Sequence, residues 1–331
     1  MNKARKKSIL RKMIIYIISI FVLSVIVFGM AKLSPGDPLV SYYGDRAERM
    51  NDEERAHAYE RLGLNEPVYV QYALWIRNAL QGDFGISFKY KKPVQDIVIA
   101  RVGNTLLLGG IGFFLIFTLA LMLAMFCVLH EGRVIDRIIC RVGTITSCIP
   151  EFWLALVLIM IFAVNLKILP ASGAYDIGQS DNVISRMSHM ILPLIVVVTG
   201  HLWYYSYMLR NRLLEETVKD YVLLYEASGL SRRQIVFRHC VRNIMPTYIS
   251  IMAISISHIV AGTYIVEMVF SYPGIGTLAF ESARYHDYNM LMYICIITGA
   301  VVIFGNIAGQ AVSEMIDPRM REQVKVVEQD D

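Results

Sequence analysis

Residues 210–245 read RNRLLEETVKDYVLLYEASGLSRRQIVFRHCVRNIM, and this charged stretch separates two long hydrophobic segments. It contains seven Lys or Arg and four Asp or Glu residues. The part from 213 to 228 lacks Pro and Gly, which predicts a helix. Gly229 suits the left-handed position that closes a helix, and Leu230 can supply the hydrophobic contact that accompanies such an end.

A second helix is predicted directly after this end. Ser231 and Gln234 have the spacing of a capping box, in which each side chain bonds to the backbone N–H of the other. The helix that they start should run over 232–245, because Pro246 follows. Residues 210–246 are therefore predicted to form a helix, a tight turn and a second helix, and we call this segment the elbow.

Composition indicates that the elbow belongs to a membrane protein. The chain is 55% hydrophobic with a mean hydropathy of +0.47, which is too apolar for an ordinary soluble domain of 331 residues. Crossing ~30 Å of hydrocarbon needs about 20 apolar residues. Six segments meet this need, at 13–31, 104–129, 142–165, 190–209, 247–270 and 290–315. The predicted fold is an all-α polytopic membrane protein with six transmembrane helices.

Positive charge predicts the orientation of these spans. Lys and Arg gather before the first span, between the second and third, in the elbow and after the sixth, and such clusters face the cytoplasm. Outside the elbow they are Lys3, Arg5, Lys6, Lys7, Arg11, Lys12, Arg133, Arg137, Arg141, Arg319, Arg321 and Lys325. The two termini and the elbow are therefore expected on the cytoplasmic side.

The chain is expected to divide at its spans. The parts are a basic cytoplasmic N-terminus (1–12), the first transmembrane helix (13–31), a folded extracytoplasmic segment (32–100), a five-helix core that includes the elbow (101–316) and a cytoplasmic tail (317–331). In the extracytoplasmic segment, Asn51 with Glu54 resembles a helix start, Gly63 a helix end and Pro67 the start of another helix. That last helix is amphipathic, which indicates packing on the membrane surface or on the transmembrane helices.

No motif indicates covalent chemistry. The sequence lacks the phosphate-binding loop of NTPases, so no nucleotide site of that type is predicted in it. Its five cysteines show no CxxC spacing, and no metal or cofactor site is predicted. His201 and His258 lie within spans. A hydrogen bond between packed helices is the favoured explanation for them, and a place on a transport path is the alternative. An intramembrane enzyme is the less favoured class.

The elbow is predicted to bind a partner, because a rigid helical turn transmits a displacement that a flexible loop absorbs. Its candidate contacts are apolar anchors and charge-assisted donors, namely Tyr221, Leu224, Tyr225, Arg232, Arg233 and Arg238. Contact with membrane lipid alone is the alternative, since anionic headgroups attract arginines. Partner binding is favoured, because attraction to headgroups does not need the defined backbone geometry that the two helix caps specify.

An ordered series of short motifs covers nearly the whole chain. It comprises Ser34-Pro35-Gly36-Asp37-Pro38, Leu62-Gly63-Leu64 with Pro67 and Gln71-Tyr72, Gly82-Asp83-Phe84-Gly85-Ile86-Ser87, Pro93-Val94, Ile149-Pro150-Glu151-Phe152-Trp153-Leu154, Leu169-Pro170-Ala171-Ser172-Gly173, His189 with Leu192-Pro193, Tyr272-Pro273-Gly274-Ile275-Gly276 and Asp317-Pro318-Arg319. In this order the motifs resemble the permease subunits of ABC importers of the dipeptide, oligopeptide and nickel class. Within the elbow, the resemblance is to the cytoplasmic EAA loop that docks on an ATPase, although Leu223-Leu224-Tyr225 stands where Glu-Ala-Ala would fall.

The resemblance implies a multi-subunit transporter in the plasma (inner) membrane of a prokaryote. It implies a second, homologous permease subunit in a heterodimer, two cytoplasmic ATPase subunits and an extracytoplasmic solute-binding protein, with no nucleic acid among the partners. The implied ATPase-coupling residues are Asp220, Tyr221, Leu224, Tyr225, Glu226, Ala227, Gly229, Leu230, Arg232, Arg233, Arg238, His239 and Asn243. The substrate stays open between peptides and nickel or metal chelates. A self-sufficient secondary transporter or channel is the alternative class.

Overall fold

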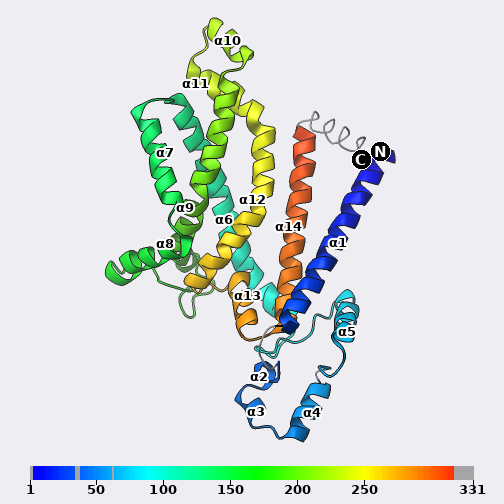
Figure 1. Ribbon diagram of the computed structural model, residues 1–331. Coiled ribbons are helices and arrows are strands. Elements are labelled where there is room, and N and C mark those ends of the chain that lie inside the picture. Colours follow the sequence, from blue (N-terminus) through cyan, green and yellow to red (C-terminus); the bar gives the residue numbers. More distant parts are fainter. Residues whose placement is uncertain (1–2, 34–37, 62, 317–331) are drawn as a thin grey trace. The chain divides into compact units, whose positions relative to one another are not determined.

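The computed structural model describes residues 3–33, 38–61 and 63–316 (Figure 1). The described residues are predominantly helical, which confirms the predicted fold class. The chain divides into two compact units, one of residues 1–103 and 273–303 and the other of residues 104–272 and 304–331. The expected tail (317–331) and most of the first motif (34–37) lie outside the described residues.

By length and composition, five helical stretches of the described chain can each cross a membrane. They are Ile14–Leu33 within α1 (Lys3–Leu33), Val94–Leu129 (α6), Val183–Thr217 (α9), Arg232–Val269, and Tyr288–Gly305 within α14 (Tyr288–Ile316). The expected count of six is reached when one bent pair of helices is also counted as a span.

That bent pair corrects the straight span expected at 142–165. Helix α7 (Val134–Ser147) meets the next helix at 95°, and the second arm consists of α8 (Glu151–Leu158) and the π-helix η1 (Ile159–Asn165). Pro150 immediately precedes α8. Proline has no N–H to donate and disfavours helical geometry in the residue before it, so the helix stops here despite its apolar composition.

The core of the second unit is formed mainly by α6, α9 and α12 (Val241–Val269). Buried side chains on these helices include Ile116, Phe117, Val196, Val197, Leu209 and Ile259. Glycines allow close approach between helices. A Cβ at Gly112 would lie 3.1 Å from Val197, and one at Gly143 would lie 2.7 Å from the Trp203 ring. Tight packing through small residues is typical of membrane helices.

The elbow is more divided than the sequence predicts. The single helix expected over 213–228 is two helices, because α9 ends at Thr217 and α10 (Asp220–Ala227) begins after a break. Asp220 favours such a break, since an acidic residue is stabilised in the first turn of a new helix. The first expected helix is therefore wrong in its continuity and correct in its end at Gly229.

The second expected helix is wrong in its end. It begins as α11 (Arg232–Ile235), widens into the π-helix η2 (Val236–Cys240) and continues as α12, with Pro246 inside that helix. Proline is tolerated within membrane helices, where neighbouring groups satisfy the backbone. Ile251 and Ile259, which follow Pro246, are buried, and their packing stabilises the helix on the far side of the proline.

In the first unit, α2 (Pro38–Tyr43), α3 (Asp45–Glu48), α4 (Asp52–Arg61) and α5 (Val68–Leu80) follow α1. The predicted start of α4 is confirmed, because the Glu54 N–H donates to Asn51 Oδ1 at 2.8 Å and the Asn51 N–H to Glu54 Oε2 at 3.2 Å. Helix α5 packs on α1, with the Tyr72 hydroxyl 2.7 Å from Ser24 Oγ. Of the two expected positions for α5, the structure shows the one on a membrane-crossing helix.

The loop before α6 is fastened within the same unit to α13 (Ile275–Arg284) and to the turn that follows it. Ser87 donates to the Asp287 carboxylate, Tyr90 donates to the Glu281 carboxylate, and Lys89 Nζ lies 2.9 Å from Glu281 Oε2. Burial, reinforced by the bond to Glu281, raises the pKa of Tyr90 to about 12. Burial alone would raise the pKa of Glu281, but the Tyr90 and Lys89 hydrogen bonds outweigh it and lower that pKa.

Candidate functional site

The turn of the elbow has the backbone geometry that its residues predict. Gly229 has φ of +84°, its N–H donates to Glu226 O at 2.9 Å, and the Leu230 N–H donates to Tyr225 O at 3.1 Å. These two bonds form the Schellman pattern that closes α10. The capping box at Ser231 is complete, since the Gln234 N–H donates to Ser231 Oγ and the Ser231 N–H to Gln234 Oε1. The turn is therefore rigid.

Glu216 at the end of α9 holds the elbow from its inner side. Its side chain is 9% exposed and accepts from Lys219 Nζ at 2.6 Å, from the Tyr221 hydroxyl at 2.9 Å and from Asn243 Nδ2 at 3.0 Å. These donors come from the α9–α10 break, α10 and α12. One carboxylate thus joins three helices, which is the type of buried network that specifies a single arrangement.

The same inner face is packed by aromatic and apolar side chains. The Tyr225 ring stacks on His239 with 3.9 Å between centroids, and Val222 is buried. Burial raises the pKa of the Tyr221 hydroxyl far above its ordinary value, and its neighbours Cys240 and Glu216 act in the same direction. Tyr221 therefore stays protonated and keeps its hydrogen to donate. Tyr221, Tyr225 and His239, which the sequence offered as partner contacts, fix the shape of the elbow.

The outer face of the elbow exposes a different set of residues. Leu223 and Leu224 are 63% and 66% exposed on α10. Figure 1 shows α10 at the far end of its unit, beyond the ends of α6 and α9. The other exposed residues among those expected to couple to an ATPase are Asp220, Glu226, Ala227, Gly229, Arg233 and Arg238, while Leu230 packs against the core. Arg232 and Asn243 are exposed too, but their side chains bond within the chain, to Glu131 and Glu216. The exposed surface of α10 thus contains the apolar pair Leu223 and Leu224, and charged residues precede and follow this pair in the sequence.

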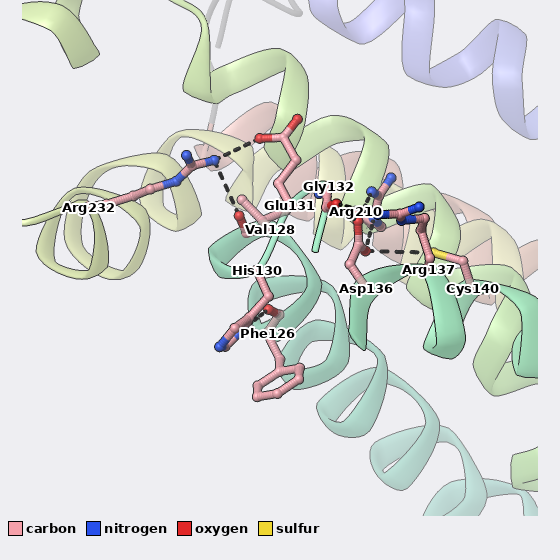
Figure 2. Close-up of polar contacts among 10 residues, drawn as sticks. All are labelled: Phe126, Val128, His130, Glu131, Gly132, Asp136, Arg137, Cys140, Arg210 and Arg232. Atoms are coloured by element: carbon pink, nitrogen blue, oxygen red, sulfur yellow. Dashed lines mark hydrogen bonds and ion pairs between the residues drawn. The ribbon is translucent and has the colours of Figure 1, made fainter. Parts of the chain in front are cut away.

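Arg232 joins the elbow to the turn between α6 and α7, as Figure 2 shows. Its Nη2 donates to Glu131 Oε2 at 2.7 Å and to Val128 O at 3.3 Å. Beside this contact, Arg210 of α9 binds Asp136 of α7 in a bidentate pair, with Nε to Oδ1 at 3.0 Å and Nη2 to Oδ2 at 2.8 Å. Asp136 is 3% exposed. Its burial and two-point geometry make this the stronger of the two ion pairs.

His201 and His258 both line one cavity of about 710 Å³ in the second unit. The cavity walls are mainly residues of α7 and α9, among them Thr144, Trp203 and Arg210, and Cys127 of α6 and His258 of α12 complete them. His201 Nδ1 lies 3.1 Å from Val197 O and 3.5 Å from Glu151 Oε1. The bond to Val197 lies within one helix, and the Glu151 contact joins α9 to α8. In the described residues no group of three or more His, Cys, Asp or Glu side chains is arranged to hold a metal ion.

Four residues of this site were not predicted as such: Glu131, Asp136, Arg210 and Glu216. Each is a charged residue close to the end of an apolar segment, which is a weak signal in one sequence because such residues are usually solvated. Asp136 carried the best hint, since it lies among three arginines of the α6–α7 region and its own partner is a fourth arginine 74 positions away.

Comparison with known proteins agrees with this architecture. Residues 116–322 match the family described as binding-protein-dependent transport system inner membrane component, and residues 6–109 match the N-terminal family of such membrane components. A chain of the MetNI methionine ABC transporter, in an inward-facing conformation, superposes with a TM-score of 0.56 at 16% identity. The superposition covers 67% of this chain and 97% of that chain, and it shows that the two share a fold.

Curated relatives extend over nearly the full chain. The oligopeptide transport system permease protein AppB of Bacillus subtilis is 31% identical, covering 94% of this chain and 98% of its own. The di/tripeptide transport system permease protein DppB of Pseudomonas aeruginosa is 28% identical (95% and 98%), and the metal-staphylopine import system permease protein CntB of Staphylococcus aureus is 27% identical (96% and 98%). The chain therefore belongs to the family of inner membrane components of binding-protein-dependent transport systems.

Proposed function

We propose that this permease forms half of the translocation path of an ATP-driven importer, and that its elbow is the docking site of an ATPase subunit. The observation that carries the proposal is the exposed pair Leu223 and Leu224 on α10. Exposed apolar side chains on a helix whose other face is locked by Glu216 are suited to fill a groove on a partner. A second permease, related to this one, completes the path, and each permease of the heterodimer binds one of two ATPases.

The proposed orientation follows from the docking site. ATP and its hydrolysing subunits are cytoplasmic, so the elbow and both termini face the cytoplasm, and the segment 32–100 faces outward. The positive charges near the chain ends support this assignment. In this orientation the loop at 82–93 and α13, which bind each other through Lys89, Tyr90 and Glu281, belong to the outer surface that receives the solute-binding protein.

The cavity between α7 and α9 is the proposed part of the path in this subunit. His201 and His258 line it together with hydroxyl and aromatic groups. Such mixed walls suit a substrate that is handed over from a binding protein and passed on without tight binding. The permease itself performs no covalent step, because hydrolysis takes place in the ATPase.

The proposed substrate class is peptides or metal chelates. The curated relatives include permeases named for oligopeptides, di/tripeptides and metal-staphylopine. All of these substrates carry amide, amine or carboxylate groups. Calorimetric titration of the solute-binding protein that works with this permease, first with short peptides and then with nickel chelates, separates the two classes.

The docking proposal is tested with Leu224→Glu. A buried interface anchor typically contributes about 2 kcal/mol, so this variant should lower ATPase affinity ~30-fold in pull-down from co-expressing membranes. Ile177→Glu is the control, because Ile177 is also an exposed apolar residue but lies between η1 and α9. Both variants should insert into the membrane normally. Full ATPase binding by Leu224→Glu would refute the docking site.

The alternative class makes an opposite prediction in proteoliposomes. A secondary transporter or channel would move substrate when this chain is reconstituted alone, without ATP or ATPase. The importer proposal expects no transport until the second permease, both ATPases, the binding protein and ATP are present.

A further inference from the structure

The contact between Arg232 and Glu131 links two parts of the chain that are 101 residues apart. Arg232 is the first residue of α11, directly after the elbow cap at Ser231. Glu131 lies in the turn between α6 and α7, which we call the α6–α7 turn (residues 130–133). Because Arg232 Nη2 also donates to Val128 O, the guanidinium is directed at this turn and is used within the chain.

The α6–α7 turn is itself held firmly. The Gly132 N–H donates to Asp136 Oδ2 at 3.2 Å, and Arg137 Nη2 donates to Gly132 O at 3.3 Å. Asp136 in turn is clamped by Arg210 of α9. A displacement that reaches Glu131 is therefore carried into α6 and α7 as a rigid movement, and it does not dissipate in a loose loop.

The ion pairs Arg232–Glu131 and Arg210–Asp136 differ in how deeply they are buried, and therefore in how much they contribute to stability. The side chains of Arg232 and Glu131 are 52% and 45% exposed, whereas those of Arg210 and Asp136 are 17% and 4% exposed. Exposed pairs contribute about 0–1 kcal/mol to stability, so the first pair matters little for folding. Its position matters more, because it joins the elbow cap to the α6–α7 turn.

We propose that Arg232 and Glu131 are positioning residues that transmit movement of the elbow to α6 and α7. The proposal rests on the docking of an ATPase at the elbow. Helix α7 provides Cys140, Gly143, Thr144 and Ser147 to one wall of the cavity, and α9 provides the facing residues. A push on the elbow passed through Arg232 therefore reaches α7, and through the Asp136–Arg210 pair it reaches α9, so both walls of the cavity respond to the elbow and access to the path changes.

The test uses the complete transporter in proteoliposomes with Glu131→Arg, Arg232→Glu and the double exchange. Each single reversal should leave ATPase binding and ATP hydrolysis in place while substrate transported per ATP falls about tenfold, the usual size of a coupling between two sites. The double exchange restores the attraction with the charges swapped and should recover transport. Arg232→Lys keeps one charged donor and should lie between the wild type and the reversals.

The surface pair Arg212 and Glu215 provides the control. Its atoms are 2.9 Å apart, its side chains are more than half exposed, and both residues lie on α9 without joining two elements. Reversal of Arg212 or Glu215 should leave the ratio of transport to hydrolysis unchanged, and a melting temperature measured for every variant detects general destabilisation.

Two results would overturn the proposal. Unchanged transport per ATP in both single reversals would mean that the pair transmits nothing. Loss of ATPase binding that the double exchange does not recover would mean that Arg232 or Glu131 contacts the ATPase directly. Failure of the docking proposal gives a different pattern, since Leu224→Glu would then bind the ATPase normally.

Discussion

Replacement of Glu216 by leucine should release α10 from the rest of the elbow. The carboxylate receives three hydrogen bonds, and each bond to a charged group contributes about 1.5–3 kcal/mol. Lys219 is 56% exposed and regains water when its partner is lost, so its bond adds little. The bonds from Tyr221 and Asn243 are the main loss, and because they share one oxygen we expect about 3 kcal/mol in total.

Hydrogen exchange of the α10 amides measures this loss directly. A local opening made easier by about 3 kcal/mol speeds exchange ~100-fold when exchange follows the opening equilibrium. Glu216→Gln keeps an oxygen that can accept from Tyr221 and Asn243, so its effect should be about 1 kcal/mol. Glu215→Leu is the matched control, because the adjacent Glu215 bonds only to Arg212 at the surface in the described contacts.

Exchange in α10 should rank Glu216→Leu above Glu216→Gln, and Glu216→Gln above Glu215→Leu. If Glu216→Leu exchanged within about twofold of the control, the carboxylate would not hold the helix. The packing of Val222 and the Tyr225–His239 stack would then account for its position.

Three further perturbations test other parts of the structure. Gly229→Val should cost about 1–2 kcal/mol from the backbone alone, because φ is +84° and a Cβ would meet nothing within 4 Å. ATP used per substrate should rise, and Gly229→Asn, which tolerates this conformation, should behave nearly as wild type. The folded pKa of Glu281 is lowered, so its bonds stabilise the protein above the ordinary pKa of a glutamate and are lost as pH falls through the folded value. Exchange of the loop at 82–93 should therefore accelerate at acidic pH and lose that dependence in Glu281→Gln. Gly143→Ala should cost about 1–3 kcal/mol by forcing the Trp203 ring to move. Gly110→Ala, with open space at its Cβ, should not lower the melting temperature.

Local chemistry was readable from the sequence. The cap at Ser231, the left-handed Gly229 and the start of α4 at Asn51 each depend on residues within a few positions of one another, and the structure confirms all three. Pro246 was misread because local propensity favours a helix end there, whereas burial of the following residues decides the outcome. Burial depends on neighbours that one sequence does not reveal.

The contacts that define the candidate site are mostly distant in sequence. Asp136 and Arg210 are 74 residues apart, and Glu216 reaches Asn243 across α10 and α11. Such pairs can be recognised only when the packing of α7, α9 and α12 is known. The sequence offered Tyr221, Leu224 and Tyr225 alike as partner contacts, whereas the structure packs the two tyrosines against the core and leaves Leu224 exposed.

The π-helix η2 fixes the direction in which the elbow points around the axis of α12. Because α11, η2 and α12 are continuous, the direction in which Arg232 points is set by the number of residues between it and α12. One residue more or fewer among 236–240 would rotate everything on the N-terminal side by about 100°. The helix end at Gly229 and the cap at Ser231 would be intact, yet α10 would face a new direction. The length of this short segment is thus as constrained as the identity of its residues, and natural insertions or deletions should avoid it.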